Sequence, residues 1–560
     1  MKRCPDCRRD YFDDSLMYCL EDGAALVSGV PDGSDAHDWQ ATEILRDLPP
    51  SRTRDDRDHE QIDGSKLPGG RRALAVVIAA SIVLLGTSGY FGYRWSRPLA
   101  EIRSLAVLPF TNESGNPDLE YLSDGMTESL IISLARLPRL SVKPRSSVFR
   151  FKGKEIDDEQ VASQLSVQAI LSGRVVQRND DLVLYLRLVD GRTGYQIWGE
   201  QYERKLAGLV ALQSEIARDV SNKLQVRLSK TEEQLVSNNY TQDTEAYQLY
   251  LRGRYHVSKM KPAESDIGIS YFQQAIKIDP SYALAYVGLA EAYRSFVISG
   301  EMAPADFMPL AKSAAQKAIE IDETLAAAHA SLALITLWNQ TDWAAAEHEC
   351  TRALELDPNL VDAHIAYAQL LLTKARYAEA ASEMKRAREL DPLNLRTNTL
   401  EGVYLSYAGQ VDAALDRLQK TIELDQNFWF AHMWASSIYS DKAMFPEAIS
   451  EAEKARNSFE NSTFANAFLG YALARSGQTA GAESVVRDLV KLSSERNVPP
   501  YHIALVYNGL GRRDDAIAWL ERAYQQRDPK LVFLKAEPKW NNLRDDPRFG
   551  SLIKRLNFPE

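Results

Sequence analysis

Alanine recurs at a fixed period of 34 residues in the C-terminal half of this 560-residue chain. The six positions are Ala346, Ala380, Ala414, Ala448, Ala482 and Ala516. Such a period is typical of stacked helix–turn–helix units, in which a small side chain marks the point where two antiparallel helices and the next unit meet. A second small position follows seven residues later, at Ala353, Ala387, Ala455 and Ala523, with Thr421 and Leu489 in the remaining units. More than half of the chain is therefore predicted to be an all-α solenoid, which offers a binding surface and not a catalytic pocket.

The 34-residue spacing resembles that of the tetratricopeptide repeat (TPR) family. We expect about eight units over residues 244–528, because Asp-Pro pairs such as Asp357-Pro358 and Asp391-Pro392 end successive helix pairs. Proline cannot continue the preceding helix. Residues 529–560 carry further apolar side chains and are expected to cap the last apolar face of the solenoid.

In TPR proteins the first helix of each pair lines a concave groove, and the resemblance places seven apolar or aromatic side chains there. They are Trp338, Ile365, Tyr407, Phe430, Met433, Phe464 and Tyr471. The basic and asparagine residues that clamp a carboxylate in chaperone-binding TPR proteins are not apparent. We therefore expect a protein partner with an apolar or aromatic segment. The alternative is that half of these side chains pack between neighbouring repeats.

Three histidines occupy one equivalent position of the repeats, at His329, His364 and His432. The TPR pattern favours a large aromatic residue at this position, and successive copies belong to different repeats. We interpret them as packing residues and not as metal ligands. Cys350 falls where the second helix buries a bulky side chain, so we expect it in the core and not as a nucleophile.

The first 27 residues form a separate cysteine module. Cys4-Pro-Asp-Cys7 has the spacing of a zinc knuckle, and Cys19 with Asp22 supplies a second pair of ligands. Glu21 competes with Asp22 for the fourth ligand position, and the alternative is an empty site with three ordinary thiols in a reducing cytoplasm. The module resembles the short zinc-ribbon heads of bacterial membrane-anchored proteins. We expect one structural zinc ion, because a core this small cannot fold without a metal.

A membrane span is predicted between this module and the rest of the chain. Residues 28–72 are polar and read as a flexible linker, and residues 73–93 contain no charged side chain. These 21 residues are long enough to cross a bilayer as one helix. Lysine and arginine are more frequent before the span than after it, which favours a cytoplasmic N-terminus and a periplasmic C-terminal region. The predicted location is thus the bacterial inner membrane, with a single pass; the alternative is a buried helix.

Residues 101–230 have a mixed α/β pattern. The runs SLAVLPF from Ser104 and ILSGRVV from Ile170 suit strands, and Leu119–Leu137 has helical spacing. These blocks resemble, in the same order, the TolB amino-terminal-like (FlgO-like) domain that precedes TPR arrays in bacterial sensory proteins. The resemblance implies an α/β interaction domain without a reaction of its own.

Two pairs of charged residues in this domain are candidate sites. Asp124 and Glu128 lie four residues apart on one helical face, which we interpret as exposed carboxylates and not as a catalytic pair. Arg145 and Lys152 flank a segment that could bind an anion, but a solvated loop is the favoured interpretation. No phosphate-binding glycine loop follows a strand.

The combined fold class is multidomain: a small zinc ribbon, one transmembrane helix, an α/β domain and a TPR superhelical solenoid. The net charge of −11 and the lack of a dense basic stripe argue against a nucleic-acid binder. We predict a non-enzymatic, membrane-anchored scaffold or sensor that binds proteins and forms a homodimer. The alternative is a signalling or transcription regulator that acts through the zinc-ribbon head.

Overall fold

The computed structural model describes residues 102–559, except 138, 155, 225–240, 260–261, 301, 340–341 and 460–461, and three short strands near the N-terminus. The chain divides into two compact units, Met1–Ser96 and Arg97–Glu560. In the first unit, β1 (Lys2–Arg3) pairs antiparallel with both β2 (Asp10–Tyr11) and β3 (Val27–Ser28).

The predicted zinc ligands and the predicted membrane span at 73–93 fall outside the described residues. Within the part of the chain that the structure describes, no helix combines the length and apolar character needed to cross a membrane.

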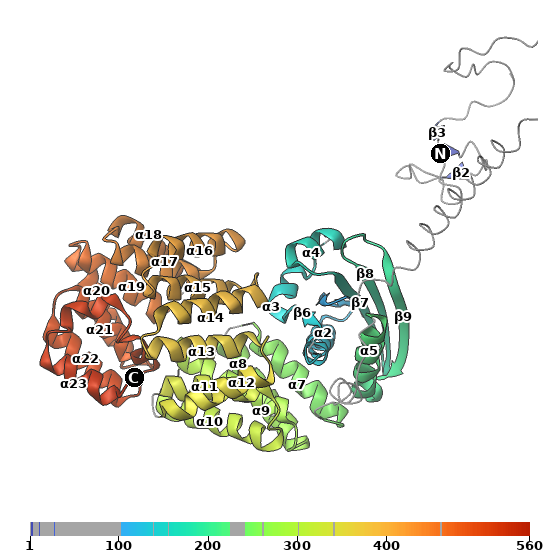
Figure 1. The fold of residues 1–560 in the computed structure, drawn as a ribbon, viewed down its shortest axis with the longest axis horizontal. Coiled ribbons are helices and arrows are strands. Elements are labelled where there is room, and N and C mark those ends of the chain that lie inside the picture. Colours follow the sequence, from blue (N-terminus) through green and yellow to red (C-terminus); the bar gives the residue numbers. More distant parts are fainter. Residues whose placement is uncertain are drawn as a thin grey trace, which may run out of the picture. The chain divides into compact units, whose positions relative to one another are not determined.

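The second unit begins with an α/β domain built on a six-stranded sheet (Figure 1). The strands are β4 (Ser104–Val107), β5 (Thr111–Asn112), β6 (Ser141–Val142), β7 (Ala169–Arg178), β8 (Asp181–Asp190) and β9 (Gln196–Lys205). The main order is β6-β4-β7-β8-β9, parallel from β6 to β7 and antiparallel from β7 to β9, and β5 adds to β7. β4 lies between β6 and β7, and its side chains Leu105, Ala106 and Val107 are fully buried, as a short apolar run predicts.

Helices complete this domain. They are η1 (Pro117–Leu119), α2 (Glu120–Ala135), α3 (Arg145–Val148), η2 (Phe149–Phe151), α4 (Asp158–Leu165), η3 (Leu206–Gly208) and α5 (Leu209–Lys223). α2 and α5 pack against each other, and each also contacts the sheet.

Eight consecutive helix pairs follow in the described residues and form the solenoid (Figure 1). The helices are α7 (Thr244–Val257), α8 (Pro262–Ile278), α9 (Ala283–Ser299), α10 (Pro304–Ile321), α11 (Ala326–Asn339), α12 (Trp343–Leu356), α13 (Val361–Thr373), α14 (Tyr377–Leu390), α15 (Leu395–Tyr407), α16 (Val411–Leu424), α17 (Trp429–Asp441), α18 (Phe445–Ser458), α19 (Thr463–Arg475), α20 (Thr479–Leu492), α21 (Pro500–Gly509) and α22 (Arg513–Gln525). The six periodic alanines are all fully buried, in the second helix of their pairs.

Local signals set the ends of these helices. The Asp243 side chain accepts from the Ala246 amide at the start of α7, and Asp342 and Ser462 cap α12 and α19 in the same way. Between the two helices of a pair, a residue with positive φ turns the chain, as at Gly409 (φ 78°) and Gly477 (φ 84°).

The C-terminal tail contains η4 (Pro529–Phe533), η5 (Pro538–Leu543) and α23 (Pro547–Leu556). α23 packs against α22 at the end of the solenoid, as a cap would, and Arg555 pairs with Glu521. η4 instead contacts α11 and α13, the first helices of two much earlier pairs. The tail therefore does more than cover the last repeat.

Candidate functional site

The inner side of the solenoid was the predicted partner surface, and the tail lies on it. The Phe533 ring is 6.0 Å from Trp338, 6.3 Å from Tyr407 and 6.4 Å from Trp434, measured between ring centroids. The Tyr407 hydroxyl donates to Glu537 Oε2 at 3.0 Å. Two predicted groove residues thus contact the chain's own C-terminal tail.

Two more predicted residues meet lysines of the tail. Lys530 Nζ lies 4.4 Å from the Phe464 ring centroid, and Lys539 Nζ lies 5.6 Å from that of Tyr471. A cation over an aromatic face is attracted by the ring quadrupole. The structure therefore brings four of the seven predicted residues, Trp338, Tyr407, Phe464 and Tyr471, around one segment.

The other three predicted residues have a packing role. Ile365 and Met433 are buried, at 5% and 0% exposure. Phe430 makes edge-to-face contacts with Trp429 and Trp434 of its own helix α17. These placements agree with the alternative that part of the set packs within the repeats.

Most residues of 528–543 are buried, although the tail was expected only to cap the last repeat. Leu531, Leu534 and Trp540 are fully buried, and Lys539 is only 4% exposed. Their placement depends on how far the solenoid curves, which no local pattern in the tail reveals. The apolar run between Lys530 and Lys535, followed by Trp540 and Leu543, was the available signal.

A second cluster joins the α/β domain to the first repeats, and here the sequence interpretation was wrong. Asp124 and Glu128 of α2 are both 5% exposed, not solvated. Arg254 of α7 binds Glu128 Oε1 at 2.6 Å, and Arg145 Nε approaches Glu128 Oε2 at 3.0 Å. Asp124 accepts from Lys152 Nζ at 2.5 Å. Arg145 and Lys152 are therefore partners of the two carboxylates, so the favoured interpretation of a solvated loop was wrong.

The charge balance of this cluster explains the burial of Glu128. Burial raises the pKa of Glu128, but the positive charges of Arg254 and Arg145 and their hydrogen bonds outweigh it, so the net pKa is lowered. Arg254 also binds Glu291 of α9 at 2.9 Å. A carboxylate held ionised between two guanidinium groups is suited to joining helices and unsuited to donating a proton.

The α/β domain also reaches the middle of the solenoid. Ser146 and Ser147 of α3 both donate to the Asp391 carboxylate, at the turn between α14 and α15. Asp391 belongs to one of the Asp-Pro pairs that sequence analysis used only as a helix end.

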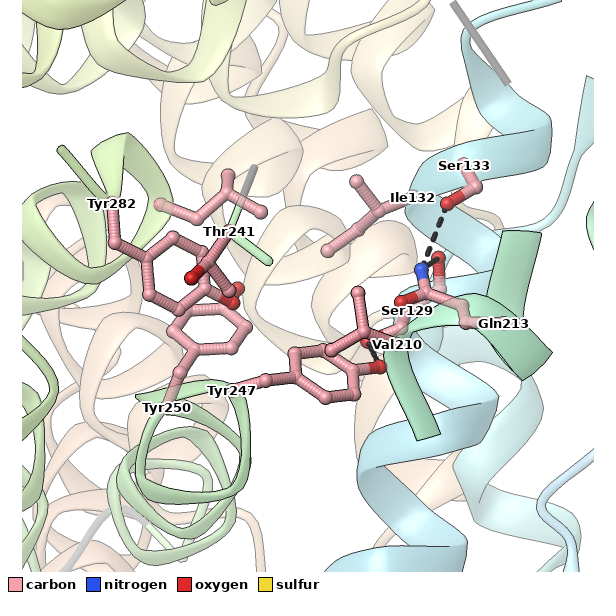
Figure 2. A pocket seen from close by; sticks show the side chains of 10 residues that line it. Ser129, Ile132, Ser133, Val210, Gln213, Thr241, Tyr247, Tyr250 and Tyr282 are labelled. Carbon is pink, nitrogen blue, oxygen red and sulfur yellow. Dashed lines mark hydrogen bonds between the residues drawn. The ribbon is translucent and has the colours of Figure 1, made fainter. Parts of the chain in front are cut away.

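A small pocket lies at the same junction (Figure 2). Three tyrosines from the repeats, Tyr247, Tyr250 and Tyr282, face α2 and α5 across it, and the Tyr247 hydroxyl donates to Ser129 Oγ at 2.7 Å. The volume is about 20 Å³, which is enough for about one water molecule. A pocket of this size has no room for a metabolite.

The recurrent histidines form equivalent polar bridges. His432 Nδ1 contacts Glu451 Oε2 at 2.5 Å, and its Nε2 contacts the Gln426 carbonyl at 2.9 Å. His329 and His364 repeat this pattern with a glutamate of the following helix and a carbonyl six residues back. They bridge the two helices of a pair, as packing residues do, and Cys350 is fully buried.

Family models match both the α/β domain and the repeat region of the second unit. A TPR family model matches residues 332–394, so the repeat region is a TPR solenoid. A model described as the second domain of HilA/YgeH-like transcriptional regulators matches residues 101–219, which is the α/β domain. The expected TolB-like relationship of this domain stays a prediction.

Two curated relatives are similar to parts of the chain. "Putative adenylate cyclase 3" of Rhizobium meliloti (strain 1021) is 34% identical over 236 residues, which are 42% of this chain and 40% of that protein. "Transcriptional regulator HilA" of Salmonella typhimurium is 24% identical over 317 residues, which are 54% of this chain and 55% of HilA. The chain thus spans about half the length, or less, of these relatives.

Among solved structures, yeast Tom70 is similar with a TM-score of 0.38 and 16% identity, over 62% of this chain and 82% of Tom70. YrrB, a TPR protein with an unusual peptide-binding site, has a TM-score of 0.25 and 21% identity, over 35% of this chain and 95% of YrrB. Likenesses at this level say nothing about function.

Proposed function

We propose that this chain is a non-enzymatic scaffold or sensor that assembles protein partners on a TPR solenoid to which its α/β domain is fixed. The observation that carries the proposal is the buried ion cluster of Glu128, Arg254 and Arg145, which joins the α/β domain to the first repeats. Repeat solenoids generally act by presenting extended surfaces.

Cross-linking of the full-length protein in cells tests this function. We expect the wild type to capture a defined set of proteins, and Glu128→Gln, which loosens the α/β domain from the repeats, to capture fewer of them. Purified protein incubated with ATP should form no cyclic AMP. Nucleotide turnover, or equal capture by wild type and an unrelated membrane protein, would contradict the proposal.

We further propose that residues 73–93 anchor the protein in the bacterial inner membrane, with a cytoplasmic N-terminus and a periplasmic C-terminal region. The support is the uncharged length of this segment and the excess of basic residues before it. Reporter fusions after Asp63 and after Glu560 should be active on opposite sides of the membrane. Activity on the same side would refute the single-pass arrangement.

The proposed single membrane span also leads us to propose a homodimer, because one transmembrane helix transmits little signal by itself. Full-length protein in detergent should have the mass of a dimer by light scattering. A monomer at every concentration tested would contradict this part of the proposal.

A zinc ion in the N-terminal module is proposed on the chemistry of its donors. Three thiolates of Cys4, Cys7 and Cys19 with a carboxylate of Asp22 suit tetrahedral zinc. Cys4 and Cys7 belong to the sequence that connects the paired strands β1 and β2. Bound zinc would supply folding energy and no reaction. Metal analysis should find about one zinc per chain, and Cys7→Ser should lose it.

The second candidate function is a signalling or transcription regulator that acts through this head. The match of residues 101–219 to the HilA/YgeH-like model is the observation that favours it. Retention of the full-length protein on DNA, lost on zinc removal, would support this function over the scaffold. We favour the scaffold because the head is short and the net charge is −11.

A further inference from the structure

The tail that fills the inner side of the solenoid is held by contacts of the kind that recognise a peptide. Asn508 Nδ2 of α21 donates to the main-chain carbonyl of Lys539 at 2.6 Å. The main-chain amide of Tyr501 donates to the Asp528 carboxylate at 3.0 Å, and Trp540 Nε1 donates to the Tyr501 hydroxyl at 2.9 Å. A side-chain amide that donates to a main-chain carbonyl of the ligand contributes affinity without regard to the side chain at that position.

Lys539 provides a sequence-specific contact. Its side chain is fully buried, and Nζ lies 2.9 Å from both carboxylate oxygens of Asp441 and 3.0 Å from Glu537 Oε1. Nζ also donates to Ser437 Oγ at 2.7 Å. Because a buried charge is costly unless it is paired, Asp441 and Ser437 of α17 discriminate against a neutral residue at this position, whereas Glu537 belongs to the tail itself.

Lys530 and Phe533 provide the second specific element. Phe533 sits among three aromatic rings, and Lys530 Nζ lies between Phe464, at 4.4 Å, and Trp338, at 5.4 Å from the ring centroid. The three rings around Phe533 come from α11, α15 and α17, so the pocket exists only in the assembled solenoid. Buried aromatic anchors of this kind usually dominate the energy of an interface.

The connection between α22 and the C-terminal tail is exposed to solvent. Gln525 at the end of α22 and the two residues after it, Gln526 and Arg527, are all solvent-exposed, and Arg527 has a positive φ of 55°. The buried segment thus begins abruptly at Asp528, which is only 1% exposed.

We infer that the inner surface of the solenoid is a peptide-recognition site that the chain fills with its own residues 528–543. Its external ligand is a partner segment with the same chemistry: a lysine, an aromatic residue three positions later, and a lysine–aromatic pair six positions beyond that. This inference rests on the proposed scaffold function and names its class of partner. A tethered segment competes at a millimolar effective concentration, so the partner binds only when it displaces the tail.

A protease site inserted between Gln526 and Arg527 of the full-length protein tests this. After cleavage, a labelled synthetic peptide of residues 528–560 should exchange into the cut protein with saturable binding and show no binding to the uncut protein. A peptide with Lys539→Gln and Phe533→Ala should bind at least tenfold more weakly. A third peptide, with only Lys530, Phe533, Lys539 and Trp540 kept on an otherwise alanine- and glutamine-rich sequence, should still compete.

Three results would overturn the inference. The cut protein could lose its helical circular dichroism signal, which would show that the solenoid needs the attached tail in order to stay folded. The labelled peptide could fail to exchange into a folded cut protein. The third peptide could fail to compete, which would remove the stated partner chemistry. In each case, continued partner capture by the uncut protein would leave the scaffold function standing.

Discussion

At the scale of single residues, the turn inside each helix pair shows how the repeat tolerates variation. The turn position is left-handed at Gly409, Gly477 and Gly511, whereas Ala375 and Ala443 adopt the same conformation at φ 57° and 59°. Left-handed backbone costs an L-residue about 1–2 kcal/mol, while glycine costs about 0.4–1 kcal/mol in unfolded-state entropy.

Ala443→Gly should therefore stabilise the protein by about 0.5–1 kcal/mol, because relief of the strained backbone exceeds the entropy cost. Denaturant titration of the wild type and variant measures this. Gly477→Ala is the matched control with the opposite sign, since a Cβ at Gly477 meets no atom within 4 Å. A destabilised Ala443→Gly variant would contradict the account.

The histidine bridges predict a pH dependence at the same scale. Burial lowers the pKa of His432, but its hydrogen bonds to Glu451 and the Gln426 carbonyl outweigh it, so the net pKa is raised. A raised pKa in the folded state adds stability below pH 6.5, and this stability is lost as the pH rises through the folded value. Burial raises the pKa of Glu451, but the hydrogen bonds from His432 and Lys454 and their charges lower it more, so the net pKa is lowered. The stability that Glu451 contributes to the folded state is therefore fully present above pH 4.5.

His432→Asn should remove the part of this dependence that His432 supplies. Asparagine is the natural residue at the equivalent position 398, where its amide donates to the Pro392 carbonyl at 2.9 Å. Melting temperatures from pH 5.5 to 8.5 should fall less steeply in the variant than in the wild type. Equal slopes would show that His432 is not protonated in the folded protein.

At the scale of elements, the joint between α2 and α7 depends on one buried carboxylate. Glu128→Gln leaves Arg254 and Arg145 without their shared negative charge, and breaking a buried ion pair costs about 3–5 kcal/mol. We expect the α/β domain to unfold at a lower temperature than the repeats in this variant, seen as a second calorimetric transition. Glu245→Gln, an exposed position on α7, should change little. A single, unshifted transition in Glu128→Gln would show that the cluster does not join the two parts.

The sequence predicted the repeat elements well because their signals are local. The periodic alanines and the Asp-Pro pairs each report on packing within one or two helix pairs, and the family match over 332–394 confirms TPR repeats. Glu128 was misjudged because its partner Arg254 is 126 residues away in the sequence. A spacing of four residues on one helix indicates a shared face but not what covers that face.

At the scale of the whole second unit, the solenoid returns on itself. Asn497 Nδ2, before α21, donates to the Gly300 and Met302 carbonyls, which follow α9. This closure brings early and late repeats around one interior and lets residues 528–543 reach Trp338 and Trp434 together. The curvature of the solenoid is the sum of small rotations between successive repeats. The sequence of the tail alone therefore could not predict where the tail lies.

Hydrogen–deuterium exchange on the intact full-length protein shows whether the tail occupies the inner surface of the solenoid. We expect the amides of Leu531, Leu534 and Trp540 to exchange as slowly as those of the core helices α17 and α19, since these residues are fully buried and their amides donate within the tail. Complete exchange of these amides within seconds, with α17 and α19 still protected, would show a free tail and contradict the account.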